Sequence, residues 1–127
     1  KLLALVEIRA SQINGCAFCL DMHVKQAKQH GEGELRLHHV AIWRESPLFS
    51  GRERAAFDWT EVLTHLPAHG VPDAVYAQVR AEFSEQEIVE LTHNVMGINA
   101  WNRLNVAFRT MPGAADAAYG LDKAQFA

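Results

Sequence analysis

The sequence predicts an all-α domain of about six helices, and three observations lead to this prediction. Apolar residues recur at intervals of three and four along almost the whole chain, which is the spacing of one face of an α-helix. Two serines are each followed three residues later by glutamate, the pattern of an N-terminal capping box. No stretch reads convincingly as a β-strand. We therefore expect helices packed together as a bundle, without a sheet.

The first three helices are predicted from apolar spacing and from the residues that interrupt it. The first is expected to end at Asn14-Gly15, because glycine favours the position just after a helix. The second is expected from about residue 16 to residue 30, and the third from residue 33 or 34 to Glu45, before Ser46-Pro47. The buried faces of the first two are expected at Leu3, Val6, Ala10 and Ile13, and at Ala17, Leu20, Val24 and Ala27.

The later helices have clearer start signals. Ser50 with Glu53 and Ser84 with Glu87 form the two capping boxes that open the fourth and sixth helices. Pro72 opens the short fifth helix between them. The sixth helix is expected to reach Arg109. Buried faces are expected at Ala56, Trp59, Val62 or Leu63 and Leu66, at Val75, Val79 and Phe83, and at Ile88, Leu91, Val95, Ile98 and Leu104 or Asn105.

Length and composition limit the domain organisation and the classes of partner. A chain of 127 residues is long enough for one core, so we expect a core domain at 1–112 and a tail at 113–127 that is either a short helix or disordered. The net charge of -3 argues against a nucleic-acid partner, because no basic stripe faces the phosphates. No apolar run approaches the roughly 20 residues of a membrane span, and no signal peptide is recognisable. We therefore expect a cytoplasmic protein without a membrane partner.

The two cysteines carry the chemistry that the sequence indicates. Cys16 and Cys19 stand three residues apart in the first turn of a predicted helix, so their sulfur atoms can meet. Unpaired amides and the helix dipole favour a thiolate there. His23 follows one turn later and can act as a base toward Cys19. This arrangement indicates thiol–disulfide chemistry in a reducing compartment.

These positions suggest different roles for the two thiols. Cys19 lies beside His23, so we assign to it the attack on a peroxide oxygen, which leaves a sulfenic acid. Cys16, expected at the exposed start of the helix, would then condense with it and be reached by an external thiol. Three alternatives stay open: a pair of core cysteines, a redox-sensing module, and a zinc site completed by Glu7, His93 or a water molecule.

The cysteine segment, SQINGCAFCLDMH at 11–23, resembles the AhpD-like alkylhydroperoxidases of the carboxymuconolactone decarboxylase family. ERAA at 53–56 with WT at 59–60, and INAWNRLN at 98–105, support the resemblance. It implies a helical fold whose subunits interlock as dimers, trimers or hexamers. It also implies a peroxidase that takes a hydroperoxide and an external dithiol reductant and needs neither metal nor haem, with Cys19 as the attacking and Cys16 as the second cysteine.

Two positions depart from the family pattern. The family's relay glutamate corresponds to Ala4, and a histidine found between the cysteines of some members corresponds to Phe18. Glu7 lies one turn after Ala4 on the same helical face, about 4.5 Å further along the axis. We therefore expect Glu7 either to orient the ring of His23 or to be a solvated residue on an amphipathic helix.

The last long helix raises two further expectations. Asn99, Asn102 and Asn105 recur every three residues, and we expect them either to line a polar pocket beside the cysteines or to face solvent. The three tryptophans are expected in the core or in subunit contacts. Apolar residues on more than one side of residues 84–109 predict self-association.

Overall fold

The predicted helices are present in the computed structural model, which describes residues 1–124. In chain order the elements are α1 (Leu2–Asn14), α2 (Ala17–Gln29), α3 (Glu34–His39), the 3-10 helix η1 (Val40–Glu45), α4 (Gly51–Thr64), α5 (Asp73–Glu82), α6 (Glu85–Ala107) and α7 (Asp116–Tyr119). None of the residues 1–124 forms a β-strand. The prediction of an all-α fold is therefore confirmed.

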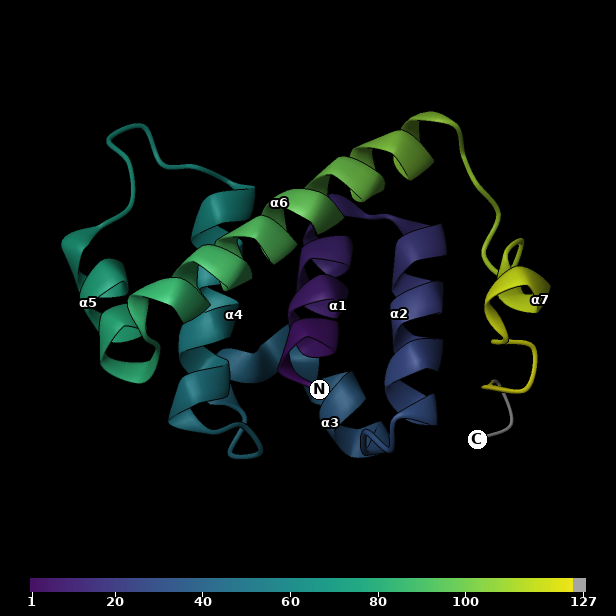
Figure 1. The fold of residues 1–127 in the computed structure, drawn as a ribbon, viewed down its shortest axis with the longest axis horizontal. Helices are drawn as coiled ribbons and strands as arrows, with labels where there is room; N and C mark the ends of the chain where they lie inside the picture. The colour runs from purple at the N-terminus through teal and green to yellow at the C-terminus, as the bar shows by residue number, and fades with distance from the viewer. Residues whose placement is uncertain (125–127) are drawn as a thin grey trace.

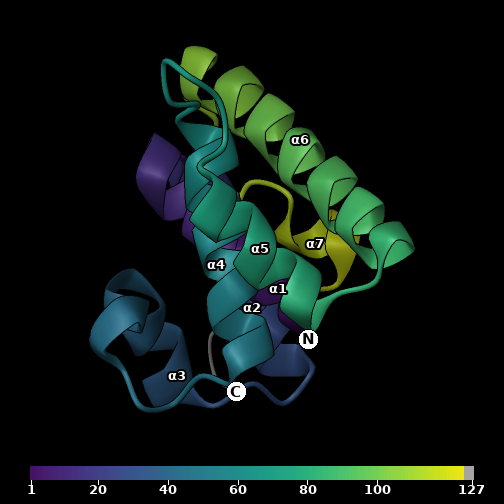
Figure 2. The ribbon, with the colours of Figure 1, turned by 90° about the vertical axis from the view of Figure 1, so that its left-hand side faces the viewer.

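Helix α1 occupies the centre of the domain. It lies between α2 and α4, and the long helix α6 runs obliquely across α4 and α1 toward the beginning of α2 (Figure 1). Helix α3 lies on the side of the molecule away from α6 (Figure 2). No helix in the described part of the chain is long and apolar enough to cross a membrane.

The central position of α1 explains where the predicted buried faces are wrong. Because α2, α4 and α6 all pack against it, α1 is buried on several sides, not along one stripe. Its fully buried apolar positions are Leu5, Val6, Ile8 and Ala10. Leu3, which was expected inside, is 47% exposed. Ala17 at the beginning of α2 and Leu66 beyond the end of α4 are also exposed.

The predicted third helix is divided in two. Helix α3 ends at His39 and the chain continues as η1, with Ile42 outside helical geometry at φ -123° and ψ 33°. Val40 and Trp43 are both buried, at 0% and 3% exposure. A 3-10 helix places residues three apart directly above each other, so this change brings both side chains to the same side. Both buried residues belong to η1, which continues the predicted helix in 3-10 geometry.

Both capping boxes are confirmed. The Ser50 hydroxyl accepts a hydrogen bond from the Glu53 backbone N–H at 3.1 Å, and the Glu53 carboxylate accepts one from the Ser50 backbone at 2.8 Å. Ser84 and Glu87 repeat this arrangement at 3.2 and 2.9 Å. Two of the four unpaired amides of each helix start are thereby satisfied.

The segment after Pro112 returns to α2 and forms the short helix α7, one of the two possibilities expected for the tail (Figure 1). Leu121 and Ala124, which follow α7, are each 1% exposed. Residues 125–127, the end of the expected tail, lie outside the described residues. A boundary between a core of residues 1–112 and a tail stays a prediction, because these contacts show packing and not independent folding.

Candidate active site around Cys16 and Cys19

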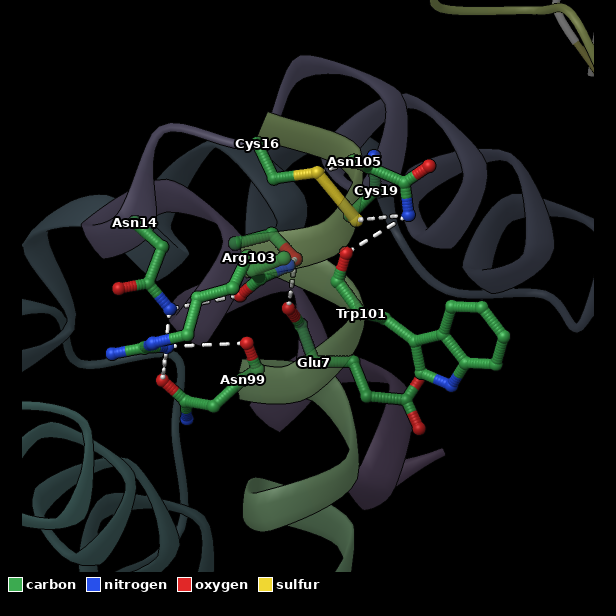
Figure 3. The surroundings of a disulfide bond; sticks show 10 residues. Glu7, Asn14, Cys16, Cys19, Asn99, Trp101, Arg103 and Asn105 are labelled. Carbon is green, nitrogen blue, oxygen red and sulfur yellow. Dashed lines mark hydrogen bonds between the residues drawn. A yellow bond between two sulfur atoms is a disulfide. The ribbon is translucent and has the colours of Figure 1, made fainter. Parts of the chain in front are cut away.

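The turn between α1 and α2 places the two cysteines. Gly15 adopts a left-handed conformation with φ 66°, which side chains rarely adopt and which ends α1. The Cys16 backbone N–H then donates to the Ser11 carbonyl at 3.0 Å. Cys16 and Cys19 are joined by a disulfide, with their Cα atoms 5.3 Å apart (Figure 3). The prediction that the two sulfur atoms can meet is therefore confirmed.

Cys16 is the N-cap residue of α2. Its sulfur accepts a hydrogen bond from the backbone N–H of Cys19 at 3.2 Å, so it lies where the positive end of the helix dipole favours a thiolate. The expectation that Cys16 is exposed is wrong. Cys16 is 1% and Cys19 3% exposed, because both pack with Ala10 and Ile98 in a small cluster between α1, α2 and α6.

His23 and Glu7 meet across the interface of α2 and α1. A carboxylate oxygen of Glu7 lies 2.7 Å from Nδ1 of His23, with the two side chains 21% and 16% exposed. The side-chain oxygen of Gln26 is 3.0 Å from the same nitrogen. Both neighbours are acceptors, and the shorter contact is with the carboxylate, so Nδ1 carries the proton and donates it to Glu7. Nε2 is then the nitrogen that can accept a proton.

A cavity of about 420 Å³ lies beside Cys19. Helix α2 contributes Phe18, Cys19, Met22 and His23 to its wall. Trp101 and Asn105 of α6 and the segment around α7 complete it. Cys19 and His23 thus line one space that could hold a small molecule, whereas Cys16 does not line it.

Asn105 is the polar residue of α6 that reaches the sulfur. Its side-chain amide lies 3.8 Å from Sγ of Cys19, within reach of an N–H···S hydrogen bond, and also donates to the Trp101 carbonyl at 2.9 Å (Figure 3). The amide points to the site from a helix other than the one that carries the cysteines. Asn105 therefore lies beside the cysteines, as the asparagine spacing suggested, but in a cavity that is lined largely by apolar side chains.

Asn99 and Asn102 have a different place. Asn102 is 0% exposed; its amide donates to the Ser11 hydroxyl at 3.1 Å, and its carbonyl accepts from Asn14 at 2.9 Å. Asn14 also donates to Asn99 at 2.9 Å. Asn99 is half-buried and Asn102 fully buried, and neither lines the cavity; both join α6 to the end of α1, just before the cysteine turn.

The three tryptophans also differ in where they lie. Trp43 and Trp59 are buried, at 3% and 6% exposure, as expected for core residues. Trp101 is 61% exposed and lines the cavity, so it is not a core residue, and its expected place in a subunit contact stays a prediction. Phe18, Met22 and Gln26 line the cavity as well. Their four-residue spacing along α2 is a signal that the sequence contains and that could have indicated one wall of the site.

The described residues do not provide the set of ligands that the alternative zinc site would need. Among residues 1–124, no three His, Cys, Asp or Glu side chains converge as a metal ion would require. His93, one candidate for the fourth ligand, is an exposed residue of α6. Glu7, the other protein candidate, is paired with His23 instead.

Comparison with known proteins gives a consistent family assignment. The profile of the carboxymuconolactone decarboxylase family matches residues 1–62. The uncharacterized protein YdfG of Bacillus subtilis is 42% identical over 103 residues, which cover 81% of this chain and 70% of YdfG. The residues that match the family profile include the cysteine turn and the two helices beside it.

Comparison with solved structures supports the same fold and family assignment. The Agrobacterium tumefaciens protein ATU0492, of unknown function and suggested to be the antioxidant defence protein AhpD, is 42% identical with a TM-score of 0.85, over 89% of this chain and 77% of that one. The debrominase Bmp8 shares the fold, with a TM-score of 0.76 at 21% identity over 97% of this chain and 65% of Bmp8. The chain has the AhpD-like helical fold and belongs to the carboxymuconolactone decarboxylase family.

Proposed function

We propose that this protein is a thiol-dependent peroxidase that reduces hydroperoxides through a dithiol–disulfide cycle of Cys16 and Cys19. The observation that carries the proposal is that Cys19 and His23 face one cavity while Glu7 holds the His23 ring at 2.7 Å. The similarity to ATU0492, suggested to be an antioxidant defence protein, supports the same activity.

In the first step the sulfur of Cys19 is oxidised. Nε2 of His23 takes the thiol proton, and the Glu7 carboxylate stabilises the imidazolium that results. The thiolate attacks the terminal oxygen of the hydroperoxide, so an S–O bond forms and the O–O bond breaks. The leaving alkoxide receives the proton from His23 and departs as an alcohol. Cys19 remains as a sulfenic acid.

In the second step Cys16 resolves this intermediate. Its sulfur attacks the sulfur of Cys19, and the hydroxide leaves as water together with the Cys16 proton. The N-cap position favours Cys16 as a thiolate, which is the attacking form. An external dithiol then supplies the two electrons and two protons that restore both thiols.

Steady-state turnover tests this function. The reduced protein is given cumene hydroperoxide with dithiothreitol in excess, and loss of peroxide is followed against a protein-free control. Many turnovers per chain are expected for an enzyme, whereas one oxidation per chain without turnover would indicate a redox sensor and contradict the proposal.

Substitution of each cysteine tests the assigned roles. Cys19→Ser is expected to abolish peroxide consumption. Cys16→Ser is expected to leave a sulfenic acid on Cys19 that dimedone traps. If Cys16→Ser loses all oxidation while Cys19→Ser keeps it, the two roles are reversed.

A further inference from the structure

The cavity beside Cys19 has a wall that comes from the C-terminal segment. Ala115, just before α7, and Tyr119, its last residue, line the cavity together with Cys19 and Trp101. Helix α7 lies beside α2, on the side away from α1 (Figure 1). No residue of this segment takes part in the two proposed steps of peroxide reduction.

Several contacts hold this wall in place. The Lys25 ammonium of α2 lies 2.7 Å from Asp116 of α7 and 2.8 Å from Asp21. The hydrogen bonds that Lys25 donates to Asp116 and then to Asp21 raise the pKa of Lys25. Gln29 donates to the carbonyl of Gly120 at 2.8 Å. Leu121, the next residue, is 1% exposed, so α7 is anchored from both ends.

The chemistry of the cavity changes across its width. Asn105 lies 3.8 Å from the sulfur of Cys19, and His23 lines the same cavity, so both can hydrogen-bond to peroxide oxygens. Phe18, Met22, Trp101 and Tyr119 offer aromatic and thioether surface around them. The volume of about 420 Å³ falls within the usual range of small-molecule sites. Hydrogen peroxide is scarcely larger than water, whose share of liquid volume is about 30 Å³, and would leave most of this apolar space unused.

We propose that α7 is a specificity wall: Tyr119 contacts the apolar group of an organic hydroperoxide and selects bulky hydroperoxides over hydrogen peroxide. This inference rests on the proposed peroxidase function. Contact with apolar surface strengthens binding only for a substrate that has such a group, so Tyr119 affects the two kinds of peroxide differently.

The kinetic test compares two peroxides. The kcat/KM values for cumene hydroperoxide and for hydrogen peroxide are measured for the full chain, and their ratio is formed. Tyr119→Ala is expected to lower this ratio about tenfold, the effect of losing part of one aromatic contact. Tyr76→Ala on α5 is the matched control, because Tyr76 is 50% exposed and does not line the cavity. An unchanged ratio in Tyr119→Ala would overturn the inference and leave the peroxidase function standing.

A binding test separates the two proposals. The inactive Cys19→Ser variant is titrated with 2-phenyl-2-propanol, the alcohol formed from cumene hydroperoxide, and the indole N–H resonance of Trp101 is followed by NMR. Trp101→Phe assigns that resonance. A saturable shift shows that the alcohol binds in the cavity. If its affinity falls about tenfold when Tyr119→Ala is combined with Cys19→Ser, the result supports the specificity wall, even if no peroxide is turned over. Equal affinity with and without Tyr119 would overturn the specificity wall.

Discussion

At the scale of single residues, the contact between Glu7 and His23 is the feature most open to test. If the carboxylate stabilises the charged ring, Glu7→Gln should slow oxidation of Cys19 by roughly 10–100-fold and leave the fold intact. The pH profile of thiol alkylation in the reduced protein should move to higher pH. Glu45→Gln is the control, because Glu45 is exposed at the end of η1. Superimposable profiles for Glu7→Gln and the native protein would mean that His23 acts without Glu7.

Asn105 permits a second test at this scale, with two substitutions that should slow the alkylation of Cys19 for different reasons. An N–H donor near Cys19 favours negative charge on the sulfur, so Asn105→Ala should slow alkylation of Cys19 a few-fold at neutral pH. Asn105→Asp replaces the donor by a carboxylate and should slow it further, because like charges repel. The measurement is the rate of iodoacetamide labelling of Cys19 in the Cys16→Ser background. Faster labelling in Asn105→Asp would contradict this role of the amide.

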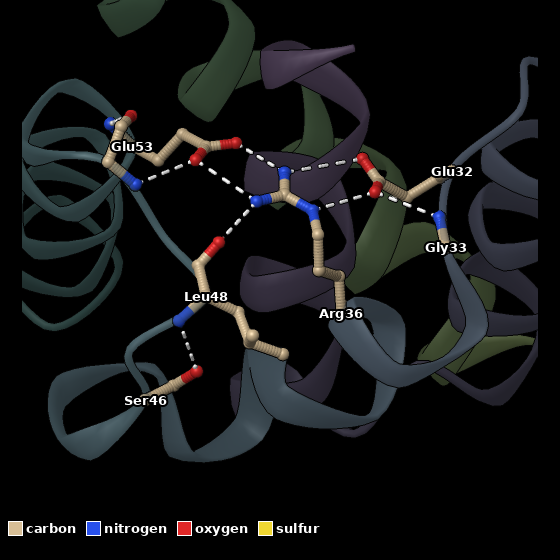
Figure 4. Close-up of polar contacts among 7 residues, drawn as sticks. Glu32, Gly33, Arg36, Ser46, Leu48 and Glu53 are labelled. Atoms are coloured by element: carbon tan, nitrogen blue, oxygen red, sulfur yellow. Dashed lines mark hydrogen bonds and ion pairs between the residues drawn. The ribbon is translucent and has the colours of Figure 1, made fainter.

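At the scale of elements, one arginine joins three segments of the chain. Arg36 of α3 pairs with Glu32 before the helix and with Glu53 in the capping box of α4, and it donates to the Leu48 carbonyl at 2.6 Å (Figure 4). Burial opposes ionisation of both glutamates and is the largest single influence on each. The hydrogen bonds and charge of Arg36, with a backbone N–H, outweigh it, so the pKa of Glu32 and of Glu53 is lowered.

This cluster predicts acid sensitivity. Because the folded pKa of each glutamate lies below the ordinary value of 4.5, the unfolded state binds more protons as the pH falls. The stabilisation is present above that value and is lost as the pH drops through the folded pKa. In Arg36→Met the two glutamates stay buried but lose their cation, so the decrease in the free energy of unfolding toward low pH should flatten or reverse. The test is the free energy of unfolding in urea from pH 7 to 3.

The control for this prediction is another arginine with a weaker pair. Arg80 contacts Glu85, whose side chain is 84% exposed, and such surface pairs contribute little. Arg80→Met should therefore keep the acid dependence of the native protein. Arg36→Met should also lower the free energy of unfolding at pH 7 by about 1–3 kcal/mol, so that the protein unfolds at a lower urea concentration. Parallel stability curves for Arg36→Met and the native protein would rule out the cluster as the source of acid sensitivity.

At the scale of the whole molecule, α6 leaves apolar surface uncovered. Of the residues that led to the prediction of self-association, Ile88, Val95 and Ile98 are buried within the domain, whereas Trp101, Val106 and Phe108 are 47–76% exposed. Met96 is 60% exposed on the same helix. Exposed apolar residues on several sides of one helix favour burial against another subunit.

We therefore expect a homo-oligomer, formed in part by α6. Sedimentation velocity at micromolar concentration should detect a dimer or larger species, and Met96→Glu should shift it toward the monomer, because a buried charge is costly. Gln86→Glu, an exposed position near the start of the same helix, is the control for added charge. A native protein that sediments as a monomer would contradict the prediction.

The sequence alone was sufficient for the features that depend on near neighbours. The helices, both capping boxes, the glycine that ends α1 and the approach of Cys16 to Cys19 follow from residues within about one turn of each other, where spacing and backbone geometry decide the outcome. The proximity of Glu7 to the cysteine helix could also be anticipated, because one turn along a helix has a known length.

Other features depend on how distant segments pack. Spacing cannot show that α1 is enclosed on several sides, that Cys16 is buried in a cluster with Ile98, or that the predicted third helix changes to 3-10 geometry at Val40. Nor can it show that Tyr119, a hundred residues after Cys19, completes the same cavity. Burial and cavity shape arise from contacts between helices, and no local signal specifies them, so only the tertiary structure decided these features.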